Sequence, residues 1–158
     1  MASIQDVVRY FVLHYPYPHE LSKTRLTKMV YLADWLSAQR QKRQITEISW
    51  FFDHYGPYVS DVYDTARKDR ELKIELSFSA YGTPKETIVM RAPNDHLATP
   101  TLSDDDKAIL DDVINNTCPL SWTKFIDYVY STYPIQTLER YSSLNLVDLA
   151  IEMESESS

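Results

Sequence analysis

Hydrophobic residues in this chain recur with two different spacings, and the order of those spacings constrains the fold more than any other feature. Spacings of three and four residues, typical of an amphipathic helix, start at Ile4, Leu26, Val59, Ile109 and Trp122. Residues 48–52 form a short apolar run, and residues 72–78 alternate between apolar and polar. The order helix, helix, strand, helix, hairpin, helix, helix predicts an α+β fold of about five or six helices with a small antiparallel or mixed sheet.

Capping residues and prolines indicate where the predicted helices begin and end. Serine side chains are suited to cap four of them, at Ser3, Ser22, Ser103 and Ser121. The second helix is predicted to run to about Gln41, and Pro134 is expected to end the fifth. Pro57 suits the first turn of the third helix, because that turn needs no backbone N–H from its first residue. Residues 144–151 are expected to form a last short helix.

The strands are predicted from shorter patterns. Residues 48–52 indicate a buried strand. Residues 72–78 and 87–91 are expected to pair as a hairpin around a turn at 81–84. Residues 92–102 contain two prolines and few apolar side chains, so they are expected to form a loop.

The chain of 158 residues has the length of one ordinary domain, and 44% of its residues are hydrophobic, which is enough to build a core. It shows no internal repeat and no linker. We therefore expect a single domain over residues 1–151, followed by a disordered acidic tail at 152–158.

Net charge and glycine content limit the classes of ligand. The formal net charge is −7, which argues against generic nucleic-acid binding and favours attraction to a basic partner. There are only two glycines, Gly56 and Gly82, and they lie far apart, so a glycine-rich phosphate loop is excluded.

Cysteine content and the N-terminal sequence indicate a compartment. Cys118 is the only cysteine, so no intrachain disulfide can form, which fits a reducing cytosol. The first residues lack the basic and apolar regions of a secretory signal, and no window of 18 apolar residues suggests a membrane span. We expect a cytoplasmic protein that does not contact a membrane.

No motif for catalysis or metal binding is evident. The four histidines lack the spacing of metal ligands, and the acidic run 104–106 is better explained as the first turn of a capped helix. No nucleophile elbow of the G-x-S-x-G type occurs. We therefore predict no catalytic residue, no cofactor and no metal, although a hydrolase site assembled across space stays open as an alternative.

Two segments carry the residue types of a recognition surface. Residues 21–31 place three cations in the first turns of the second helix, where the helix dipole disfavours positive charge. Residues 50–63 place tyrosines beside a Gly-Pro turn, and tyrosine gives a large contact area at low entropy cost. The predicted partner-binding residues are Lys23, Arg25, Lys28, Tyr55 and Tyr58.

The same two segments resemble the Panacea domain, also called the SocA-like antitoxin domain. The first is similar to that family's cationic helix, with Lys23, Arg25 and Lys28 ahead of an apolar run, and the second to its aromatic strand and Tyr-Gly-Pro turn. The similarity spans roughly residues 4–150. One departure is the stretch 129–134, which lacks the histidine often present there.

The resemblance implies a bacterial or phage antitoxin, not an enzyme, that neutralises a protein toxin encoded beside it by binding it directly. SocA-like members can also act as adaptors that deliver the toxin to a cytosolic AAA+ protease. An autorepressor that binds its own promoter is the competing interpretation, supported by the basic helix and opposed by the net charge. The identity of the toxin and the oligomeric state stay open.

Overall fold

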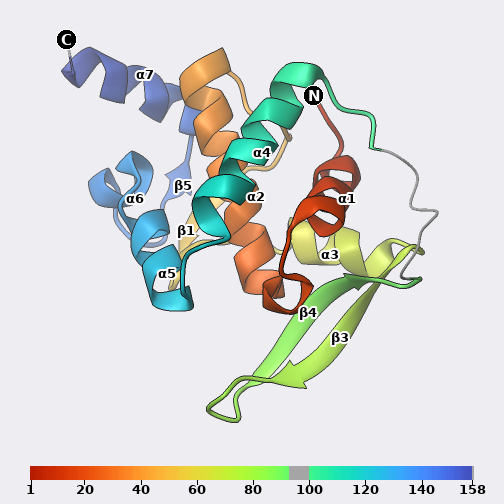
Figure 1. Cartoon of the computed structure of the whole chain (residues 1–158). Helices are drawn as coiled ribbons and strands as arrows, with labels where there is room; N and C mark the ends of the chain where they lie inside the picture. The colour runs from red at the N-terminus through yellow and green to blue at the C-terminus, as the bar shows by residue number, and fades with distance from the viewer. Residues whose placement is uncertain (93–99, 158) are drawn as a thin grey trace.

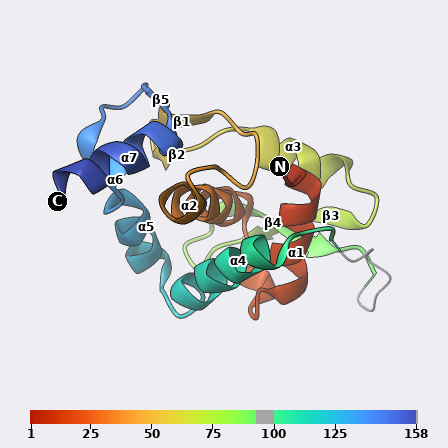
Figure 2. The same ribbon diagram turned by 90° about the horizontal axis from the view of Figure 1, so that it is seen from above.

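The second helix, α2 (Lys23–Gln41), is the axis of the molecule. The computed structural model describes residues 1–92 and 100–157, and within them α2 contacts helices on several sides (Figure 2). Most residues of α2 are buried, including charged ones. A helix enclosed on all sides has no solvent to satisfy its polar side chains, so those side chains must find partners inside the protein.

Six further α-helices surround α2 in the described part of the chain: α1 (Ile4–His14), α3 (Asp61–Lys68), α4 (Asp104–Thr117), α5 (Trp122–Tyr130), α6 (Tyr133–Thr137) and α7 (Leu146–Glu156). A single 3₁₀ turn, η1 (Pro18–Glu20), joins α1 to α2. All four predicted serine caps are confirmed, because the hydroxyls of Ser3, Ser22, Ser103 and Ser121 each accept a backbone N–H of the first turn.

Two small antiparallel sheets complete the α+β fold that the sequence predicts. In the first, β1 (Trp50–Asp53) lies between β2 (Gly56–Pro57) and β5 (Ser143–Leu144). The second is the predicted hairpin, in which β3 (Leu72–Phe78) pairs with β4 (Pro84–Met90). The hairpin projects away from the helical body (Figure 1).

The prediction for Pro57 is wrong. Gly56 adopts a φ of +99°, so the chain reverses and Pro57 pairs with Phe52 instead of starting a helix. The ring carbon Cε1 of Tyr130 lies 3.0 Å from the point where a Cβ on Gly56 would sit. Glycine is therefore required for both its backbone angle and its size. The third helix starts later, after Ser60.

The C-terminal quarter contains more regular structure than expected. Pro134 does not end α5 as predicted: α5 ends at Tyr130 with Ser131 as its C-cap, and Pro134 lies in the first turn of α6, where its missing N–H costs nothing. Leu144 belongs to β5 and not to the last helix. Helix α7 continues to Glu156, so residues 152–156 are helical where a disordered tail is expected. His96, most of the predicted loop 92–102 and Ser158 lie outside the described residues.

Candidate partner-binding surface

Lys28 is buried, contrary to its predicted place at a partner interface. Its side chain lies on the face of α2 that meets the β1–β2 turn and is 1% exposed. The ammonium Nζ donates hydrogen bonds to the carbonyl oxygens of Tyr55, at 2.9 Å, and Pro57, at 3.1 Å. Burial lowers the pKa of Lys28 to about 8, and the nearby charge of Asp53 partly opposes that shift. Lys28 therefore fastens the aromatic turn to α2 and is not available to a partner.

Arg25 is a second correction, because it too is buried, at 3% exposure. Its Nη2 donates to the carbonyl oxygens of Thr117, at 2.8 Å, and Leu120, at 3.1 Å, where α4 ends. The guanidinium carbon lies 4.5 Å from the ring centroid of Phe125. A cation is favourable at a helix C-terminus, so the charge misplaced with respect to α2 is well placed with respect to α4.

The other three predicted residues keep some exposure. Lys23 is half-exposed, with Nζ 3.7 Å from a carboxylate oxygen of Glu86 and 4.8 Å from the ring centroid of Tyr63. Tyr55, at the tip of the β1–β2 turn, is 75% exposed. Tyr58 is half-buried, and burial raises the pKa of its phenol. The groups that compensate the positive charges at the start of α2 therefore belong mostly to this protein and not to a partner.

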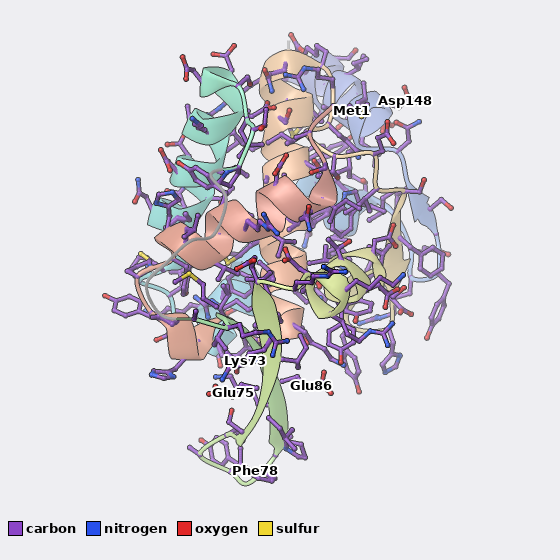
Figure 3. All side chains as sticks on the ribbon, turned by 90° about the vertical axis from the view of Figure 1, so that its right-hand side faces the viewer. Met1, Lys73, Glu75, Phe78, Glu86 and Asp148 are labelled. Atoms are coloured by element: carbon purple, nitrogen blue, oxygen red, sulfur yellow. The ribbon has the colours of Figure 1, made fainter. Side chains whose placement is uncertain are left out.

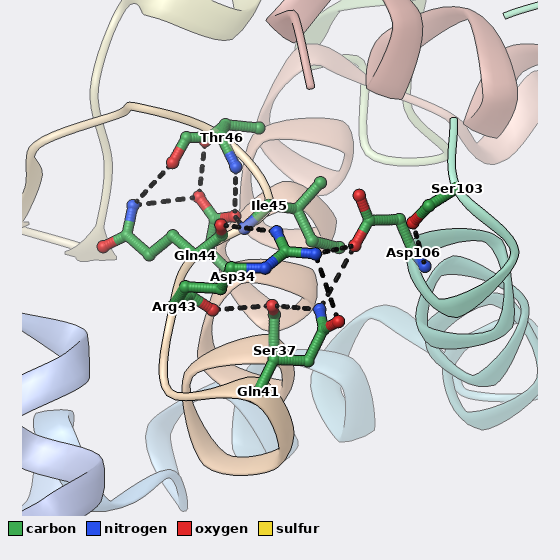
Figure 4. Close-up of polar contacts among 9 residues, drawn as sticks. All are labelled: Asp34, Ser37, Gln41, Arg43, Gln44, Ile45, Thr46, Ser103 and Asp106. Atoms are coloured by element: carbon green, nitrogen blue, oxygen red, sulfur yellow. Dashed lines mark hydrogen bonds and ion pairs between the residues drawn. The ribbon is translucent and has the colours of Figure 1, made fainter. Parts of the chain in front are cut away.

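Asp34 is a buried polar residue that the sequence patterns did not reveal. Its Oδ1 accepts the backbone N–H groups of Ile45 and Thr46, both at 2.9 Å. Its Oδ2 accepts the hydroxyl of Thr46, at 2.6 Å, and the indole N–H of Trp50, at 2.8 Å. Figure 4 shows the loop folded over this carboxylate. Burial raises the pKa of Asp34 to about 6, and these hydrogen bonds oppose the shift.

A second polar cluster, also in Figure 4, ties the end of α2 to the start of α4. Arg43 Nη2 lies 3.3 Å from Asp106 Oδ1, and the amide of Gln41 donates to the same oxygen at 3.2 Å. The Arg43 carbonyl accepts the hydroxyl of Ser37 at 2.6 Å. Every group in this cluster is used to hold the loop, so it is a structural cluster and does not offer a ligand site.

A groove of about 670 Å³ opens between the hairpin, the start of α2 and the α4–α5 turn. Three large exposed side chains with apolar surface lie in its lining: Leu76 at 65% exposure, Trp122 at 48% and Tyr81 at 96%. Lys23 and Glu86 lie where α2 and β4 approach one another, and Lys85 lies beside them on β4. Of the predicted residues, Lys23 and Arg25 line this groove, whereas Tyr55 and Tyr58 lie outside its lining.

A catalytic centre is not evident in the described ranges. No group of three or more histidine, cysteine, aspartate or glutamate side chains there could hold a metal ion. Of the histidine rings described, His54 contacts the hydroxyl of Tyr141 at 3.1 Å, and His14 packs against Tyr10 with the two rings tilted by 44°. Neither ring contacts a serine or the thiol of Cys118. The described surface therefore offers contact area and charge but no assembled nucleophile and base.

A family model of the SocA-like antitoxin, Panacea domain, matches residues 26–134, which is more than half of the chain. The chain belongs to that family. The matched range contains Lys28 and Asp34, the aromatic strand with its Gly-Pro turn, the hairpin and α4, whereas Arg25 lies directly before it. Searches of curated proteins and of solved structures return no match. No helix in the described ranges is apolar over a length sufficient to cross a membrane.

Proposed function

We propose that this protein is a cytosolic antitoxin that neutralises one cognate protein toxin by binding it directly. Membership of the SocA-like antitoxin family carries the proposal. An enclosed scaffold that exposes apolar and aromatic side chains at a few places suits such a role. Of the predicted contact residues, Lys23, Tyr55 and Tyr58 are the ones that a toxin can reach, and we retain these three as proposed contacts.

The competing interpretation of an autorepressor loses its main support. It depended on the basic start of α2, yet Arg25 and Lys28 are buried and hydrogen-bonded to backbone carbonyls. Cations without solvent exposure cannot neutralise DNA phosphates, and the net charge of −7 opposes phosphate contact elsewhere. We therefore favour protein binding over nucleic-acid binding.

The decisive experiment uses the product of the open reading frame adjacent to this gene. That product is expressed from an inducible promoter with and without this protein, and growth is recorded. We expect growth arrest by the neighbour alone, rescue on co-expression, and a complex that co-purifies. Growth arrest that persists although both proteins accumulate in soluble form would contradict the proposal.

Delivery of the toxin to an AAA+ protease is a further part of the proposal. Its test is the half-life of the toxin after protein synthesis is stopped, in cells with and without this protein. An adaptor shortens the half-life of the toxin, and the effect disappears when the protease is deleted. A toxin that is stable in the presence of this protein would indicate neutralisation by blockage alone.

A further inference from the structure

One face of strand β3 in the hairpin is apolar from the core to the tip. Side chains two residues apart on a strand point to the same side. Along β3 these are Leu72, 1% exposed, Ile74, half-buried, and then Leu76 and Phe78, 65% and 66% exposed. Figure 3 shows Phe78 near the tip of the hairpin, far from the helical body. The apolar face thus continues beyond the part that this chain covers itself.

The groove lies on that same face. Leu76 pairs across the hairpin with Glu86, and both line the groove, so its hairpin wall is the apolar face. The opposite wall is the start of α2 with residues 120–122. Trp122 stacks on the buried ring of Phe125, with centroids 5.8 Å apart, and so holds a rigid apolar surface towards the groove.

The charge of the groove differs from that of the rest of the molecule. Its lining contains the cations Lys23, Arg25 and Lys85, against the acids Glu20 and Glu86, so the groove is locally positive by one charge. The chain as a whole has a net charge of −7. In addition, two buried polar atoms of the lining have no hydrogen-bond partner among the described residues, Nε of Arg25 and Oε2 of Glu86, so the cation is not the only group left unsatisfied. A carboxylate is the group that complements this environment.

We infer that this groove receives a segment of the toxin that carries apolar side chains next to a carboxylate. The apolar side chains would cover Leu76 and Trp122 in the groove and Phe78, which lies outside the lining but on the same face of β3. The carboxylate would lie near Lys23 and Lys85. The inference rests on the proposed function and names the surface and the partner chemistry for it. A second copy of this chain fits less well, because the charged residues of its own hairpin in this lining, Lys85 and Glu86, sum to zero and so bring no net negative charge into the groove.

The first test measures affinity for the product of the adjacent open reading frame. We expect the double variant Leu76→Ser with Phe78→Ser to weaken binding by about 30-fold or more, as loss of central apolar contacts does. Lys85→Glu is expected to weaken it by about 5- to 10-fold. The matched control is Ile151→Ser on α7, an apolar residue 51% exposed and remote from the hairpin, which should change affinity less than about twofold.

The second test places a photo-crosslinking benzoylphenylalanine at position 78 or, as control, at position 151. The inference predicts a crosslink to the toxin from position 78 only, mapped by mass spectrometry to a segment with apolar and acidic residues. A crosslink from position 78 to a second copy of this chain would overturn it. Unchanged affinity of the double variant would overturn this inference alone, whereas absence of binding by the unsubstituted chain would overturn the proposed function as well.

Discussion

Helix α2 holds two surface segments by two buried charges of opposite sign, and the two anchors are built differently. Asp34 receives four short hydrogen bonds, of which two come from backbone N–H groups of the loop it holds. Lys28 donates to only two carbonyl oxygens of the turn it holds, although an ammonium group has three N–H donors. The loop at residues 45–50 is therefore secured more completely than the turn at 55–57.

The comparison indicates that a buried charge on a central helix serves to hold other segments of the same chain. Neither anchor has an ion-pair partner among the described residues, so each charge is stabilised by backbone dipoles and neutral donors. Such charges bind segments of the same chain, and their loss should loosen those segments before it affects any partner.

Asp34→Ala should cause the largest loss of stability, about 3–5 kcal/mol, because it leaves several buried donors without an acceptor. Urea unfolding followed by tryptophan fluorescence measures this, since Trp50 is itself a partner of Asp34. Asp34→Asn keeps one oxygen and should lose less. A loss below about 1 kcal/mol for the alanine variant would mean that the loop is held by other contacts.

Lys28→Met should cost about 2–3 kcal/mol, which is less than Asp34→Ala, since the methionine also removes the penalty of burying an ammonium. The same urea titration measures it. Lys23→Met is the matched control and should change stability by less than about 0.5 kcal/mol, because Lys23 is half-exposed and its ion pair is long. Equal losses for the two lysine variants would contradict the contrast between them.

The stability of the protein should rise with pH because of Lys28, since losing the proton removes the cost of burying an ammonium group. The pKa of Lys28 in the folded protein, about 8, lies below the value of 10.5 for an unburied lysine, so the folded state disfavours the charged form. Its contribution to stability is therefore present above pH 10.5 and is lost as the pH falls through 8. Between pH 7 and 9.5 the stability of the unsubstituted protein should rise by about 2 kcal/mol relative to Lys28→Met. A constant difference over that range would show that Lys28 titrates normally.

Phe78→Ser should have the smallest effect on stability, within about 0.5 kcal/mol, because its ring is 66% exposed and lies at the end of the hairpin. Thermal unfolding of the variant beside the unsubstituted protein checks this. A larger loss would mean that the hairpin tip folds back against the body in solution and that its apolar face is covered by this chain.

Local patterns predicted the elements that depend on neighbouring residues. The four serine caps and the hairpin follow from a few adjacent positions and are present in the structure, although β4 begins at Pro84, within the predicted turn. The α+β class followed from the order of those elements. Single-domain organisation stays a prediction.

The errors concern features that depend on distant parts of the chain. Lys28 and Arg25 appeared exposed because a charged residue is rarely buried, and the carbonyls that receive them come from the β1–β2 turn and the end of α4. Pro57 pairs with Phe52 beyond a turn whose Gly56 lies against the ring of Tyr130, and β5 exists only because β1 lies beside it. The sequence predicted the hairpin as a pair of strands, but it did not indicate that the hairpin would project beyond the helical body.

The pairing of β1 with β5 also affects how the protein is made. Phe51 pairs with Ser143, and the N–H of Phe52 donates to the carbonyl of Ser142, so this edge of β1 finds its partner only roughly 90 residues later. At about 5–20 residues per second, a ribosome needs roughly 5–20 s to synthesise that interval. During that time the nascent chain presents an aromatic strand with an unpaired edge, which chaperones or a second nascent chain can contact before the sheet closes.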